Sequence, residues 1–220
     1  MGLFGAPFLS VSTKKLHYKY LIMAALLSIK KCKPFKLLGN PLAATDVIQF
    51  WFEDIEPKQR FIKDLEFDEL LRVKFGDVHH LASQGLLYAW REHPLDALAE
   101  IIVLDQFSRN IFRDTEQAFA TDTLALVLAQ EAIRKKFDKE LDNSKKSFFY
   151  MPFMHSESKE IHDIALFLFD QPGLEDSFNF EVKHKAIIDR FGRYPHRNEL
   201  LGRKSTDEEL EFLSQPGSSF

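Results

Sequence analysis

The spacing of apolar residues constrains the fold of this chain more than any other feature. Between residues 45 and 213, apolar side chains recur at intervals of three and four, as they do at Phe67, Leu71, Phe75 and Val78. That spacing places them on one face of an α-helix, because a helix completes a turn every 3.6 residues. No stretch shows the alternation of apolar and polar residues that a half-buried strand requires. The pattern predicts an all-α fold of about eight helices, packed as antiparallel helical hairpins, with no sheet.

Several residues are expected to begin or end helices. Gly192 is predicted to adopt the left-handed conformation that ends a helix, and Ser205 and Glu208 have the spacing of a capping box before the last helix. His79 and His80 lie at the edge of the apolar stripe of residues 65–83. No ligand-type residue lies at a matching i+4 position, so we expect these two to be surface or capping histidines rather than metal ligands.

A long helix is predicted in the middle of the chain. Asp114 or Thr115 is expected to cap it, and basic residues near position 136 are expected to favour its C-terminal end. Phe119, Leu126 and Val127 are predicted to face the core from this helix.

Residues 1–44 differ from the rest of the chain and are expected to be an extension outside the domain. Lysines flank an apolar run of ten residues, YLIMAALLSI, whereas a helix that spans a bilayer needs about 20. We expect the extension to be a disordered tail or an artefact of the gene model, with a short apolar helix at this run. Residues 45–213 are predicted to form a single helical domain, followed by a tail at residues 214–220.

Charge and cysteine content exclude several classes of protein. The formal net charge of -4 gives no general attraction to nucleic acid or to an anionic membrane surface. We therefore expect no nucleic-acid partner and no stable membrane insertion. The single cysteine, Cys32, excludes an internal disulfide and a multi-cysteine metal site, which favours a cytoplasmic location. No cofactor is predicted.

The stretch LDQFSRNIFRDTEQAF, residues 104–119, combines the helical period with charge. Leu98, Ile102, Asp105 and Arg109 fall at helical spacing, so an acid and a base lie on the stripe expected to face the core. A buried carboxylate without a partner would be strongly destabilising or would become protonated, so Asp105 needs partners. The stretch FGRYPHRNELLGR, residues 191–203, contains suitable cations. We therefore predict that these two stretches meet in the folded protein.

Four strings in the chain resemble one protein family. The strings are IQFWF, LDQFSRNIFRDTEQAFATD, YMPFMHSE and FGRYPHRNELLGRKSTDEELEFL. They closely resemble the mostly bacterial family known as domain of unknown function 924, which is placed in the tetratricopeptide-repeat-like helical superfamily. The resemblance covers residues 45–213 and implies a fold but no established activity. Family members usually have proline after DQF, where this chain has Ser108, and the serine is expected to relax the local backbone.

The charged strings supply candidate site residues of two kinds. His155 and His196 are candidate catalytic residues because histidine titrates near neutral pH and can carry a proton, and Asp105 is the third candidate. The candidate ligand-binding residues are Arg109, Asn110, Arg113, Glu157, Arg193, Arg197, Asn198 and Arg203. No pair of these residues has the HxxxH or HxxE spacing of a metal site, so no metal is predicted.

Two hypotheses account for this set of residues. In the first, five arginines share only four nearby acids, Asp105, Asp114, Glu157 and Glu199, and two unpaired arginines form a pocket for a phosphate or carboxylate ligand. Such a pocket would bind a small anionic molecule and could be hydrolytic. In the second, the charges only join the C-terminal loop to the central helix, and a tetratricopeptide-repeat-like scaffold binds a peptide or protein. Neither hypothesis names a substrate, a reaction or an oligomeric state.

Overall fold

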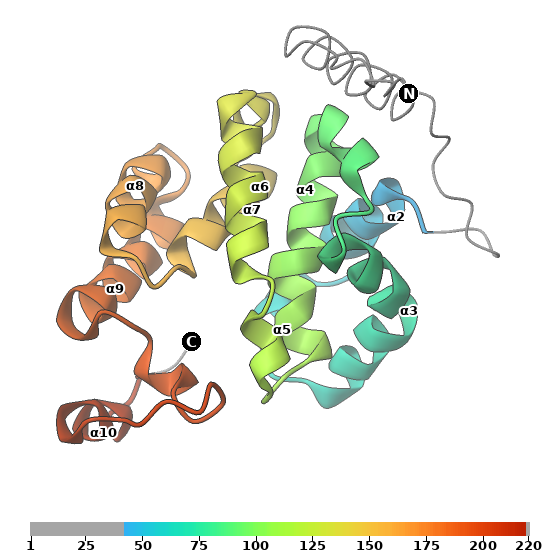
Figure 1. Cartoon of the computed structure of the whole chain (residues 1–220). Helices are drawn as coiled ribbons and strands as arrows, with labels where there is room; N and C mark the ends of the chain where they lie inside the picture. The colour runs from blue at the N-terminus through green and yellow to red at the C-terminus, as the bar shows by residue number, and fades with distance from the viewer. Residues whose placement is uncertain (1–41, 219–220) are drawn as a thin grey trace, which may run out of the picture. The chain divides into compact units, whose positions relative to one another are not determined.

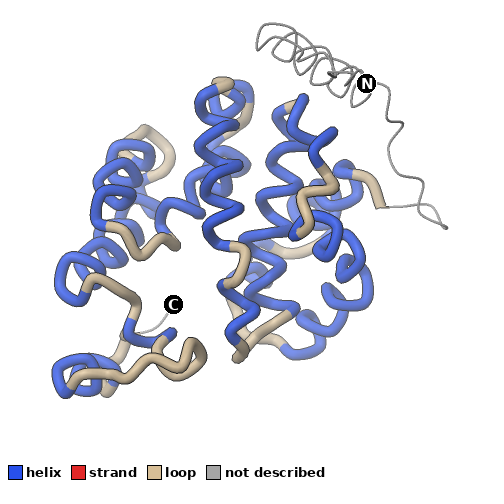
Figure 2. The backbone as a smooth tube through the Cα atoms, in the orientation of Figure 1, coloured by secondary structure: helices blue, strands red, loops and turns tan. Residues whose placement is uncertain are grey.

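A computed structural model describes residues 42–218, and every regular element in them is a helix (Figure 1). The α-helices are α2 (Ala44–Gln49), α3 (Leu65–Ser83), α4 (Pro94–Ile102), α5 (Ser108–Ile111), α6 (Asp122–Arg134), α7 (Asn143–Met154), α8 (Lys159–Phe169), α9 (Glu175–Phe191) and α10 (Asp207–Leu213). A π-helical turn, Val103–Phe107, joins α4 to α5, so the described residues contain eight helical rods. Figure 2 shows no strand in this part of the chain. The predicted all-α fold is confirmed.

Helix α4 lies in the middle of the described residues. It packs against α2 on one side and against α6 and α7 on the other, while α8 and α9 form a hairpin beyond α7 (Figure 1). Helix α3 packs against α5 and against the π-helical turn. Short loops join α7 to α8 and α8 to α9, as antiparallel helical hairpins require, whereas the packed pairs α2 with α4 and α3 with α5 are not consecutive in the chain.

Aromatic rings fill the core between α3, the π-helical turn Val103–Phe107 and a second π-helical turn, Phe50–Asp54, which continues α2. The ring centroid of Phe107 lies 4.8 Å from that of Phe75 and 5.3 Å from that of Trp51. All three side chains are fully buried. Burying one such side chain contributes on the order of 2 to 3 kcal/mol, so this packing firmly fixes the turn to which Phe107 belongs.

Helix α6 begins later than the sequence predicts. The helix expected from Asp114 or Thr115 starts at Asp122, because Asp114 has a φ angle of 60° and a 3-10 turn, Glu116–Phe119, follows it. A residue in this left-handed region interrupts a right-handed helix. The later start also changes the buried face, and Val127, predicted to face the core, is 51% exposed. The buried side chains of α6 are Ala125, Leu128, Ala129 and Ala132, and the partly buried Leu124, Leu126 and Ile133 also pack against the core, as predicted for Leu126.

The predicted helix ends are partly confirmed. Gly192 follows α9 with a φ angle of 69°, as expected of a left-handed helix end. The capping box of α10 lies one residue later than predicted, at Thr206 and Glu209, where each side chain accepts a hydrogen bond from the other residue's backbone N–H. Glu209 also binds Arg193. Glu209 thus both caps α10 and joins it to a residue that follows α9.

The sequence predicted that His79 is a surface or capping histidine, but it is a core residue. Its side chain is buried, and its Nε2 lies 2.7 Å from the hydroxyl of Ser108. The Ser108 hydroxyl also lies 2.9 Å from the hydroxyl of Thr121 and donates to the Leu104 carbonyl. Ser108 therefore does more than relax the backbone, since it links α3 to the start of α6.

Some predictions concern residues outside the described part of the chain. Residues 1–41 lie outside it, and with them most of the predicted extension and Cys32. Within residues 42–218, no helix is both long enough and apolar enough to cross a membrane. The predicted domain limits, residues 45–213, stay a prediction.

Replacing His79 by glutamine is expected to make stability less dependent on pH. Burial lowers the pKa of His79 from 6.5 to about 4. The folded protein therefore keeps this imidazole neutral while the unfolded chain takes up a proton below pH 6.5. The contribution of His79 to the free energy of unfolding is fully present at pH 7.5 and decreases as the pH falls. At pH 5 it is smaller by about 2 kcal/mol.

Urea denaturation of the wild type and His79→Gln at both pH values measures this difference. His80→Gln, at the exposed neighbouring position, is the matched control. An equal loss of stability at pH 5 in the wild type and His79→Gln would contradict the expectation.

Candidate functional site

Asp105 lies in the π-helical turn and is buried, with an exposed fraction of 1%. Its Oδ1 lies 2.7 Å from Nδ1 of His155, the residue that follows α7, and 3.2 Å from a terminal nitrogen of Arg109. The side chain of Gln106 donates to its other oxygen. π-Helical turns within α-helices occur frequently at functional sites. Here the turn carries the one carboxylate that contacts a histidine beside a cleft.

The contacts of Asp105 and His155 determine their charge states. Burial alone would raise the pKa of Asp105, but the neighbouring His155 and Arg109 hold that pKa well below its usual range. Burial and the charge of Arg109 lower the pKa of His155, despite the opposing effect of Asp105. An ionised carboxylate only accepts hydrogen bonds, so His155 donates through Nδ1 and its Nε2 is unprotonated.

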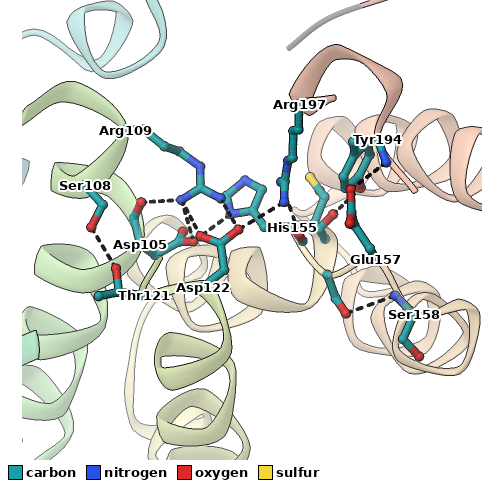
Figure 3. Close-up of polar contacts among 12 residues, drawn as sticks. Asp105, Ser108, Arg109, Thr121, Asp122, His155, Glu157, Ser158, Tyr194 and Arg197 are labelled. Carbon is teal, nitrogen blue, oxygen red and sulfur yellow. Dashed lines mark hydrogen bonds and ion pairs between the residues drawn. The ribbon is translucent and has the colours of Figure 1, made fainter. Parts of the chain in front are cut away.

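The carboxylate of Asp122 joins two of the charged stretches (Figure 3). Arg109 donates to its Oδ1 over 3.0 Å and to its Oδ2 over 3.2 Å, and Arg197 donates to Oδ2 over 3.1 Å. Among the described residues, no ion pair joins Asp105 directly to Arg193 or Arg197. The two stretches that were predicted to meet do so through Asp122 and through a direct contact of Arg197 with the ring of Phe119.

Arg197 also contacts the end of α7. It lies in a short 3-10 turn, Pro195–Arg197, and its second terminal nitrogen donates to the backbone carbonyl of His155 over 3.1 Å. Its guanidinium carbon lies 4.6 Å from the ring centroid of Phe119 and 4.5 Å from that of Tyr194. These contacts hold the backbone of His155 from the side of the C-terminal loop.

Two other ion pairs secure the C-terminal loop. Arg203 binds Glu157 over 2.6 Å, and Glu157 also accepts a hydrogen bond from the backbone N–H of Tyr194 over 2.7 Å. Arg193 binds Glu209 over 2.6 Å, and this contact lowers the pKa of Glu209 to about 2. These predicted site residues therefore have partners within the protein.

Arg113 and Asn110 belong to a different part of the molecule. Arg113 pairs with Asp68 of α3 over 2.5 Å, and Asn110 donates to the same carboxylate over 2.8 Å. Neither residue lines the cleft described below. Their contacts join α5 to α3, so their predicted role in ligand binding gains no support from their positions.

His196 and Asn198 do not line the cleft either. The ring of His196 lies 5.5 Å from that of Tyr194, and its buried Nδ1 has no hydrogen-bond partner within residues 42–218. Burial and the charge of Arg197 lower the pKa of His196 to about 4. Asn198 donates to Ser205 over 3.0 Å. Of the two predicted catalytic histidines, only His155 faces the cleft.

The arginine pairing contradicts the charge count made from the sequence. Each of the five arginines has a carboxylate partner, so the two unpaired arginines that the anion-pocket hypothesis required are not present. Asp114, counted as a nearby acid, pairs with Lys63 instead. Sequence reasoning missed Asp68, Asp122 and Glu209. Asp122 could have been found, because it ends the string LDQFSRNIFRDTEQAFATD.

A cleft of about 560 Å³ lies among α6, the end of α7 and the C-terminal loop. Three predicted site residues, His155, Glu157 and Arg197, contribute to its lining, and Asp105 and Arg109 contact lining residues without reaching it. The other lining residues are Glu116, Gln117, Phe119, Ala120, Asp122, Thr123, Leu126, Pro152, Ser156 and Leu201. In the part of the chain that the structure describes, no group of three His, Cys, Asp or Glu side chains could hold a metal ion.

These features define an all-helical protein with a buried network of acids, arginines and a histidine beside a cleft. A family model described as "Bacterial protein of unknown function (DUF924)" matches residues 47–217, and the chain belongs to this family. The chain is 40% identical to a protein of unknown function, ATU0120 from Agrobacterium tumefaciens, whose solved structure superposes with a TM-score of 0.73. This match covers 77% of this chain and 96% of that one.

Among curated proteins, none matches this chain. The predicted relation to the tetratricopeptide-repeat-like superfamily stays a prediction.

Asp122→Asn is expected to lower the free energy of unfolding by about 3 kcal/mol, because it leaves the buried guanidinium of Arg197 without a carboxylate. Urea denaturation measures the change. Glu131→Gln is the matched control, since Glu131 pairs with the exposed Arg134 and the loss of an exposed ion pair should change the free energy of unfolding much less.

A double-mutant cycle with Arg197→Met isolates the interaction between Asp122 and Arg197 from other effects of each substitution. If Asp122→Asn lowered the free energy of unfolding no more than Glu131→Gln does, the ion pair between Asp122 and Arg197 would not be important for stability.

Proposed function

We propose that the cleft binds a small molecule and that His155 accepts a proton there, from the ligand or from a water molecule that attacks it. The observation that carries the proposal is the 2.7 Å contact of Asp105 Oδ1 with His155 Nδ1, in a histidine that lines the cleft. A carboxylate that holds one imidazole nitrogen leaves the other as the proton acceptor. This function is general-base catalysis, which includes hydrolysis.

The surroundings of His155 support this role. Its lowered pKa keeps the imidazole neutral at pH 7, which is the form that can accept a proton. Its backbone carbonyl binds Arg197 and its Nδ1 binds Asp105, so both the backbone and the ring orientation are restrained. Catalytic groups need such restraint, because small displacements reduce the rate of proton transfer.

An anionic ligand, phosphate or carboxylate, is a narrower version of this proposal. Among the arginines of the two charged stretches, Arg197 alone contributes to the cleft lining, and it already binds Asp122. The arginine-rich sequence therefore supports an anionic ligand less than the contact between Asp105 and His155 supports proton transfer.

A second proposal is that the helices bind a peptide or protein partner. Four large apolar side chains of α8 and α9 are exposed to solvent, and that of Phe167 is 81% exposed. The other three are Ile164, Phe180 and Val182. Large exposed apolar side chains occur in interaction sites. In this case the charged network would only secure the C-terminal loop.

A thermal-shift screen of water-soluble metabolites tests the first proposal. At least one compound is expected to raise the Tm of the wild type, since a ligand at 100 times its Kd adds about 2.7 kcal/mol to stability. Leu126→Trp places an indole in the cleft and is expected to abolish the shift. His155→Gln is expected to keep most of the binding but to reduce turnover by about 10²-fold to 10⁴-fold.

Leu95→Trp is the matched control, because Leu95 is exposed and does not line the cleft. The proposal is abandoned if no compound stabilises the wild type, or if the active compound stabilises Leu126→Trp equally. Either result would favour the second proposal.

A further inference from the structure

We infer that the ligand of the cleft is an uncharged molecule that carries both hydroxyl groups and an apolar part. The inference rests on the proposed function, because it assumes that the cleft binds a small molecule. Some polar groups in the lining already have hydrogen-bond or ion-pair partners within the protein, whereas others remain available to a ligand.

The charged side chains in the depth of the cleft are already paired. Both oxygens of Asp122 accept from Arg109, and one also accepts from Arg197. Both oxygens of Glu157 accept from Arg203 over 2.6 and 2.9 Å. Both terminal nitrogens of Arg197 donate, one to Asp122 and one to the carbonyl of His155, while its buried Nε has no hydrogen-bond partner within residues 42–218. Each of these charged side chains therefore already has a partner of opposite charge within the protein.

A charged ligand would therefore have to displace an existing contact. A phosphate group that bound Arg197 would compete with Asp122 and would approach its carboxylate, a group of like charge. A cation that bound Asp122 would likewise compete with Arg109. Glu116 also lines the cleft, but it is exposed to solvent, where water weakens ion pairing. A neutral ligand has none of these costs.

Uncharged hydrogen-bonding groups in the lining do remain available. Nε2 of His155 is an acceptor without a partner among the described residues. The hydroxyl oxygen of Ser156 accepts from the backbone N–H of Ser158 over 3.2 Å, and its hydrogen has no acceptor within residues 42–218. Hydroxyl groups of a ligand can donate to His155 and accept from Ser156, which matches this acceptor and this donor.

Another part of the lining is apolar. Phe119, Leu126 and Leu201 are partly exposed where they line the cleft, and Pro152 is buried beside them. A cleft of about 560 Å³ is in the usual size range for small ligands. An apolar group of the ligand would cover these side chains while its hydroxyl groups reach His155 and Ser156.

Three probes that share a phenyl ring test the charge of the ligand. They are phenyl β-D-glucopyranoside, which is neutral, phenyl phosphate, which is an anion, and phenyltrimethylammonium, which is a cation. Saturation-transfer NMR and titration of the full-length protein are expected to give a Kd for the glucoside about tenfold lower than for either ion. Leu126→Trp should abolish binding of the glucoside, whereas Leu95→Trp should not.

Ser156→Ala is expected to weaken binding of the glucoside by about three-fold to ten-fold, which corresponds to the loss of one hydrogen bond. Ser83→Ala, which removes an exposed hydroxyl at the end of α3, should leave the Kd unchanged.

The inference is overturned if phenyl phosphate or phenyltrimethylammonium binds more tightly than the glucoside and Leu126→Trp abolishes that binding. In that case the proposed binding function stands and only the ligand class is wrong. The inference is also overturned if the glucoside does not bind. The proposed function then depends on the metabolite screen, whose failure would remove it independently.

Discussion

The carboxylate of Asp122 determines how the C-terminal loop joins the central helices. It accepts hydrogen bonds from Arg109 of the central rod and from Arg197 of the loop, and Arg197 is almost completely buried. A buried guanidinium needs a carboxylate, so the loop can pack against α6 only where Asp122 is available. Asp122 is the first residue of α6. Its place therefore depends on where α6 begins, which is later than the apolar pattern suggests.

The contacts that stabilise this junction also determine the chemistry of His155. Asp105 binds its Nδ1, and Arg197 binds its backbone carbonyl. The same burial that makes these contacts strong lowers the pKa of His155 and leaves an unprotonated nitrogen beside the cleft. The same residues can therefore stabilise the junction and accept a proton. A histidine can be restrained through one ring nitrogen and react through the other.

The number of arginines in a sequence is a poor measure of the positive charge that a ligand encounters. The charged stretches of this chain contain five arginines, and each has a carboxylate partner in the folded protein. Paired guanidinium groups join elements of the structure and contribute little to the binding of anions. The groups left near the cleft are mainly uncharged. The charge of a ligand is therefore inferred from the groups that lack partners.

The sequence by itself determined the helical fold, most helix positions, the glycine that ends α9, and the involvement of two charged stretches in one junction. The helical features depend on the local period of apolar residues and on local backbone preferences, and the junction follows from the need of a buried carboxylate for cationic partners. Only the tertiary structure decided which acid pairs with which arginine and that His79 is a core residue. Arg197 and Asp122 are 75 residues apart, and His155 and Asp105 are 50 apart. Local pattern carries no information on such contacts, because they depend on how the helices pack.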